Sequence, residues 1–270
     1  MTIERVTSYP GYDSPILQWY AGAYDMAYIA LHPFVRIPGL DPAHCEPWTM
    51  HVDSTAVPPE QTPFDVMRQL RNEQSSNFSP HVVDELSKRR GITLRWSEAG
   101  EAAGFNDPCD LNRALLSSIG ALKREYEDSA GAERLSQYCS EQKIFMPTEG
   151  RFQSSMESLI VEVFQHAGYD QVEFADEFDE ASSTIAVEKL RSEEPWSSIT
   201  GFPVRAGRIF TADRTLLAVV DWDSFFTLIC GKAERLEHVA LAELFEGFWC
   251  GLGTTHQWWR QSSSLQPFRN

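Results

Sequence analysis

Basic residues are scarce in this sequence. Its 270 residues contain 23 Lys and Arg against 39 Asp and Glu, which gives a formal net charge of −16. Recognition of nucleic acid depends on clusters of Lys and Arg that neutralise phosphates. We therefore expect no binding to nucleic acid. A negative potential of this size favours a basic protein partner, although solubility alone also accounts for it.

Long apolar runs and a secretory leader are missing as well. The run from Leu216 to Val220, for example, ends at Asp221, whereas a helix that spans a membrane needs roughly 18 apolar residues. The first residues, Met1 to Arg5, do not show the basic and then apolar pattern of a signal peptide, so we expect none. Five cysteines, an odd number without CxxC spacing, are typical of reduced thiols. The sequence predicts a cytoplasmic protein with no membrane contact.

Familiar catalytic and cofactor motifs are also absent. The Walker pattern, the dinucleotide-binding glycine pattern, HExxH and GxSxG do not occur. Each of these patterns marks a common way of holding a phosphate, a nicotinamide, a zinc ion or a serine nucleophile. We therefore expect no cofactor.

Prolines divide the first sixty residues. Because proline restricts its own backbone and that of the residue before it, residues 1–60 are expected to form an irregular arm with one short helix around Ile16 to Leu31. Residues 61–200 are expected to be mostly helical. Ser79-Pro80 and Thr62-Pro63 resemble helix starts, which predict helices over 80–90 and 63–73.

Apolar residues at helical spacing predict two further helices in this middle region. One follows Asp107-Pro108 and extends to Tyr126. The other is capped by Thr148, has an apolar face from Phe152 to Phe164, and ends near Gly168. A strand is expected over residues 92–96, and a helix over 184–191. The acidic stretch from Val172 to Glu180 is expected to form a strand followed by a loop.

Residues 201–260 change in character. Short apolar runs at 208–210, 216–220 and 225–230 are separated by turn residues, a helix is expected over 236–244, and a strand over 248–250. The predicted class is α+β, with a C-terminal antiparallel meander, helices on one face and a helical middle region. The whole chain is expected to form one compact domain, with residues 261–270 as a polar tail.

Four segments resemble an uncharacterised bacterial family, the domain of unknown function numbered 2711. The resemblance lies in residues 144–150 (IFMPTEG), residues 221–228 (DWDSFFTL), residues 246–249 (EGFW) and Thr255-His256. It implies a bacterial cytoplasmic protein, and it implies no activity. The outline of the C-terminal meander is also similar to that of several toxin-immunity proteins.

Two groups of carboxylates are candidates for contact with a basic partner. One is the pair Asp221 and Asp223, which would share a face if the segment were extended and which would accept backbone amides if it were a turn. The other is an acidic stretch without any basic residue: Asp170, Glu173, Asp176, Glu177, Asp179 and Glu180.

His256 lies beside two tryptophans near the end of the folded part. An imidazole that titrates near neutrality could act as a general base, with Asp221 and Asp223 as partners. Packing of Trp258 and Trp259 over the sheet is the alternative interpretation. His44, Cys45, His51 and Asp53 form the densest set of metal-capable side chains, although their spacing is not typical of a zinc site.

Two functions follow from these residues. The first is a non-enzymatic protein, similar to an immunity protein or antitoxin, whose acidic surface binds a basic protein. The alternative is a small-molecule hydrolase or transferase that uses His256 with Asp221 and Asp223.

Overall fold

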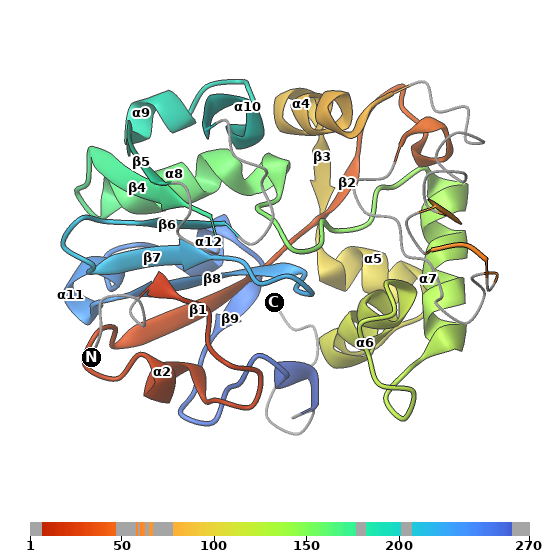
Figure 1. Cartoon of the computed structure of the whole chain (residues 1–270), viewed down its shortest axis with the longest axis horizontal. Coiled ribbons are helices and arrows are strands. Elements are labelled where there is room, and N and C mark those ends of the chain that lie inside the picture. Colours follow the sequence, from red (N-terminus) through yellow and green to blue (C-terminus); the bar gives the residue numbers. More distant parts are fainter. Residues whose placement is uncertain are drawn as a thin grey trace.

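An antiparallel sheet of seven strands is the centre of the part of the chain that the computed structural model describes, namely residues 7–46, 58, 60–62, 65–66, 78–176, 182–200 and 207–260. The strand order is β5-β4-β6-β7-β8-β1-β9 (Figure 1). The strands are β1 Met26–Leu31, β4 Gln171–Ala175, β5 Ser182–Ala186, β6 Arg208–Phe210, β7 Leu216–Val219, β8 Phe226–Gly231 and β9 Gly247–Trp249.

The C-terminal meander is confirmed. Strands β6, β7 and β8 pair in sequence order, and β9 returns to the sheet. Between them, the helix expected over 236–244 is two short helices, α11 Ala233–Leu236 and α12 Leu241–Leu244. Short runs of branched and aromatic residues form these strands because each side chain finds apolar neighbours on one face or the other.

Strand β1 corrects the expectation for the N-terminal region. The helix expected over Ile16 to Leu31 is confined to α2 Ile16–Trp19, and Met26–Leu31 forms a strand between β8 and β9. The prediction was wrong because the run MAYIAL is apolar throughout, so that periodicity does not distinguish a doubly buried strand from a helix. Part of the expected arm is therefore an interior strand.

Both faces of the sheet are covered. Alternate residues of each strand point to opposite faces, and they join two separate apolar clusters. One cluster contains Ile29 with residues of α2, α5 Trp96–Ala102, α6 Pro108–Ser118 and α7 Ser129–Gln142. The other contains Tyr28 with α8 Glu157–His166, α9 Val187–Leu190, α10 Trp196–Thr200, α11 and α12. The predicted α+β class is confirmed, with a second helical layer added to the expected one.

The middle region is largely helical, as expected. Helix α4 Pro80–Arg90 has the predicted bounds, and α6 begins at the predicted Pro108 but ends at Ser118. Residues 184–191, expected as one helix, divide between β5 and α9. The strand expected at 92–96 is β3 Ile92–Leu94, which pairs with β2 Phe34–Arg36 in a small second sheet. The helix expected over 63–73 falls largely outside the described residues.

Two buried ion pairs hold helix α4 in place: in one the helix supplies the acid, Asp84, and in the other it supplies the base, Lys88. Arg151 donates to both carboxylate oxygens of Asp84, at 2.7 and 2.9 Å. One turn further along the helix, Lys88 Nζ donates to Glu157 Oε2 at 2.7 Å. Residues four apart lie on one side of a helix, so this side of α4 is fixed to the segment 151–157. None of the helices in the described ranges is both long enough and apolar enough to cross a membrane.

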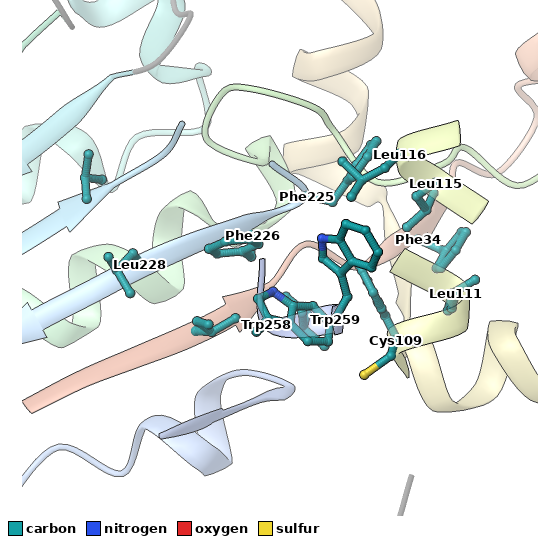
Figure 2. Packing of buried hydrophobic residues seen from close by; sticks show 14 of the residues in the cluster. Phe34, Cys109, Leu111, Leu115, Leu116, Phe225, Phe226, Leu228, Trp258 and Trp259 are labelled. Atoms are coloured by element: carbon teal, nitrogen blue, oxygen red, sulfur yellow. The ribbon is translucent and has the colours of Figure 1, made fainter. Parts of the chain in front are cut away.

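The tryptophans near the C-terminal end of the described chain join the sheet to the helices. Trp258 and Trp259, in the 3₁₀ turn η4 Trp258–Arg260, are both buried. Figure 2 shows them between Phe226 of β8 and Leu111 of α6. This packing confirms the alternative interpretation of the two indoles, which was that they cover the sheet.

Candidate functional site

The segment Asp221-Trp222-Asp223-Ser224 forms a tight turn between β7 and β8. The backbone N–H of Ser224 donates to the carbonyl oxygen of Asp221 at 3.2 Å, and the Ser224 hydroxyl donates to the same oxygen at 2.8 Å. The turn alternative is therefore the correct one for this acidic pair. The two carboxylates differ in environment: only 19% of the Asp221 side chain is exposed, and Asp223 is half-buried.

Asp221 and His256 lie together, as the sequence predicted for the enzymatic alternative. Asp221 Oδ2 is 3.7 Å from His256 Nδ1. The Tyr9 hydroxyl is 3.1 Å from the same nitrogen, and the Tyr12 ring packs edge-on against the imidazole with 4.5 Å between centroids. N-terminal residues thus complete a group that the sequence placed in the C-terminal region alone.

Burial sets the protonation of this group. His256 is only 5% exposed, and this desolvation lowers its pKa to about 3. The pKa of Asp221 is raised to about 6, mainly by burial and in smaller part by the nearby charge of Asp223, while hydrogen bonds from the Trp222 N–H and the Tyr12 hydroxyl oppose the shift. At neutral pH the pair is therefore a carboxylate beside a neutral imidazole. The group that titrates near neutrality is Asp221 and not the histidine we expected.

His32 connects two of the segments that carry the family resemblance. Its Nδ1 is 2.7 Å from the Thr148 carbonyl oxygen, and its Nε2 is 3.0 Å from the Thr227 hydroxyl. The ring is fully buried, and burial lowers its pKa to about 4. We identify it as a structural histidine that ties residues 144–150 to β8.

One further contact joins two of these segments, and another ties residues 246–249 to the start of α5. The Gly150 N–H donates to the carbonyl oxygen of Ser224 at 3.0 Å. Glu246, which precedes β9, accepts hydrogen bonds from the backbone N–H groups of Trp96 and Ser97 at the start of α5. Four short stretches that are distant in sequence are therefore packed around one end of β1 and β8.

The acidic stretch is only partly within the described residues. The structure describes Asp170, Glu173 and Asp176, whereas Glu177, Asp179 and Glu180 lie outside the described ranges. Glu173 is paired within the chain, because its carboxylate accepts from Arg214 at 3.0 Å.

Strand register relates the acidic stretch to the turn. Ala175 of β4 is opposite Arg208 of β6, and Arg208 is opposite Val219 of β7. Asp176 and Asp221 follow these strands at the same end of the sheet. The two positions are two strands apart, or roughly 10 Å.

Only two of the four metal-capable residues, His44 and Cys45, lie within the described residues. His44 closes the 3₁₀ turn η1 Pro42–His44 and Cys45 follows it, whereas His51 and Asp53 lie outside the described residues. The Cys45 thiol donates to the carbonyl oxygen of Asp41 at 3.3 Å, and burial raises its pKa. Within the described ranges, His, Cys, Asp and Glu side chains form no group of three that could hold a metal ion.

Comparison with known proteins gives one family. The sequence model of a family described as "Protein of unknown function (DUF2711)" matches residues 12–260. A relative in Bacillus subtilis (strain 168), named "Uncharacterized protein YwbB", is 21% identical over 252 residues, which are 92% of this chain and 96% of that protein. No solved structure matches significantly.

Proposed function

Since this chain belongs to the DUF2711 family, which is described as having no known function, we propose its role from its own side chains. It is a non-enzymatic cytoplasmic protein, similar to an immunity protein or antitoxin, that binds a basic protein partner. The contact is the acidic end of the sheet, defined here as Asp176, Asp221, Trp222 and Asp223 with Tyr12.

The observation that carries this proposal is the register of β4, β6 and β7. It brings Asp176 of the acidic stretch and the turn to the same end of the sheet. Carboxylates that are gathered in this way speed the encounter with a basic surface and disfavour acidic competitors. Arg208, whose side chain is buried, lies at the same register between them.

Two partly exposed aromatic rings accompany these carboxylates. Trp222 is 41% exposed between the two acidic residues of the turn, and Tyr12 is 44% exposed where it contacts the Asp221–His256 pair. Trp and Tyr are enriched among the residues that dominate binding energy, and a Lys or Arg of a partner can pack on their faces. The combination of ring and carboxylate suits an arginine-rich surface.

The register also narrows the set of carboxylates that we expected to take part. Asp170 precedes β4, so it lies at the opposite end of that strand from Asp176. Glu173 is engaged by Arg214. Both residues are therefore left out of the proposed contact.

Matched substitutions test this proposal. After the partner has been co-purified with the native protein and identified, its affinity for purified variants is measured at several salt concentrations. Trp222→Ala is expected to weaken binding about 30-fold, the equivalent of about 2 kcal/mol. Asp223→Lys should slow association and flatten the salt dependence, whereas Asp170→Lys should leave both unchanged. Equal effects of Asp223→Lys and Asp170→Lys would reject the acidic end of the sheet as the contact.

The distance between Asp221 and His256 favours a second candidate, a small-molecule hydrolase or transferase. In that reaction Asp221, with its pKa near 6, would transfer the proton, and His256 and Tyr9 would hold it in place. The measurement is turnover of chromogenic esters and phosphates between pH 5 and 8. If the native protein is active and its rate changes with pH near 6, loss of this pH dependence in Asp221→Asn would support the enzymatic function. Absence of turnover in the native protein would reject it.

A further inference from the structure

A large cavity lies where β2, α4, α7 and residues 144–153 meet, and Phe225, just after the turn, also lines it. Its volume is about 580 Å³, which is within the range typical of sites for small organic ligands, about 300 to 1,000 Å³. Most of the exposed wall is apolar, with contributions from Val35, Val83, Ile144 and Phe145. Such a wall is suited to the hydrocarbon or aromatic body of a ligand.

The cavity wall contains one buried cation and one buried anion, and their charges cancel. Arg151 and Asp84 both line the cavity, both are buried, and they face each other in a two-bonded pair at 2.7 and 2.9 Å. A cation and an anion held in this geometry satisfy each other and leave little net field for a charged ligand. Glu46 and Glu149 are also in the wall, are partly exposed, and have contacts of their own. An anionic ligand would meet these carboxylates at a cost.

One polar side chain in the wall is left without a partner. Ser87 belongs to the same side of α4 as Asp84 and is 6% exposed, and its hydroxyl makes no hydrogen bond to any described residue. Buried hydroxyl groups are nearly always paired in native proteins. A ligand with a carbonyl or hydroxyl group would supply the missing partner.

We propose that this cavity binds an uncharged small organic molecule, with an apolar body against Val35, Val83 and Phe145 and an oxygen atom that is hydrogen-bonded to Ser87. The site is separate from the proposed partner contact, because none of the residues of the acidic end of the sheet lines the cavity. Residues 144–149, which belong to one of the segments of the family resemblance, form part of its wall.

The probe for this site is prodan, a neutral naphthyl ketone whose emission moves to shorter wavelength in apolar surroundings. We expect saturable binding to the full-length protein. Ala43→Trp and Ser140→Trp each add bulk at the edge of the cavity and are expected to abolish binding, with folding verified by circular dichroism. Ala130→Trp is the matched control, since this exposed residue of α7 does not line the cavity, and it should bind prodan as the native protein does.

Removal of the hydroxyl tests the ligand class. Ser87→Ala is expected to weaken prodan binding about fivefold, the value of one neutral hydrogen bond. The same variant should bind 2-dimethylaminonaphthalene, which lacks the carbonyl, as well as the native protein does. Absence of saturable binding, or binding that both tryptophan variants leave intact, would overturn the site. An equal response of both probes to Ser87→Ala, or tighter binding of an anionic naphthalene sulfonate than of prodan, would overturn the proposed ligand class.

Discussion

Substitution of Asp221 by Asn is expected to make the protein more stable at neutral pH. The carboxylate is largely buried beside an uncharged histidine, and this burial raises its pKa from 3.8 to about 6. The folded protein therefore binds a proton more tightly at this position than the unfolded chain does. Asparagine has the same shape as the protonated acid but carries no charge, so it avoids the cost of burying the carboxylate.

The sign and the size follow from proton linkage. A carboxyl group with a raised pKa contributes stability below its unfolded pKa and loses it as pH rises through the folded pKa. The shift of about two units corresponds to about 3 kcal/mol. Of this, about 1.5 kcal/mol falls between pH 4.5 and 6. The free energy of unfolding changes by about 1.4 kcal/mol per pH unit midway between the two pKa values, and by about half as much at pH 6, where the folded group is half titrated.

Urea unfolding of the native protein and of Asp221→Asn at pH 4.5, 5.2, 6 and 8 measures this difference. Titration of His256 is common to both proteins and largely cancels in the comparison. The advantage of the variant should grow by about 1.5 kcal/mol from pH 4.5 to 6 and should change little above pH 7. A difference that is independent of pH would show that the carboxyl group titrates normally, and would refute the assignment of Asp221 as the group that ionises near pH 6.

Two further predictions concern stability. Asp84→Leu alone should lower the free energy of unfolding by about 3 to 5 kcal/mol, because it leaves the Arg151 charge buried without its partner, and the double variant Asp84→Leu/Arg151→Met should recover most of this loss in urea unfolding. Equal losses in both would contradict the reasoning. Gly150→Ala should destabilise more than Gly120→Ala when melting temperatures are compared. Both glycines have positive φ, at 64° and 69°, but only at Gly150 would a Cβ overlap the carbonyl oxygen of Trp222. The same loss at both positions would exclude that overlap as a cause.

Local sequence signals predicted the elements whose bounds depend on neighbouring residues. Ser79-Pro80 at the start and Gly91 at the end bracket α4 correctly, because a proline in the first turn and a glycine after the last turn act through the backbone itself. Turn residues likewise separated β6, β7 and β8. The family resemblance, based on four short segments, is confirmed by the match over residues 12–260.

Elements that depend on distant partners were harder to predict. Strand β1 was mistaken for a helix because its partners, β8 and β9, lie about 200 residues further along the chain. Strand β5 was mistaken for part of a helix for the same reason, since its short polar sequence gains its conformation from pairing with β4.

The candidate sites divide in the same way. His256 and Asp221 were predicted to lie together, and they do, but the burial that inverts their expected protonation was not visible in the sequence. Tyr9 and Tyr12, which complete that group, gave no sequence signal at all. The cavity beside Arg151 and Ser87 was also missed, because its wall comes from segments between residues 35 and 225 that share no motif.

The sequence by itself determined the excess of negative charge, the α+β class and the meander, because composition and short-range patterns act on each segment without reference to the others. The tertiary structure alone decided which carboxylates share one end of the sheet, which ionisable groups are buried, and where a cavity remains. These properties depend on strand register and on desolvation, and both arise only when distant segments are packed against one another.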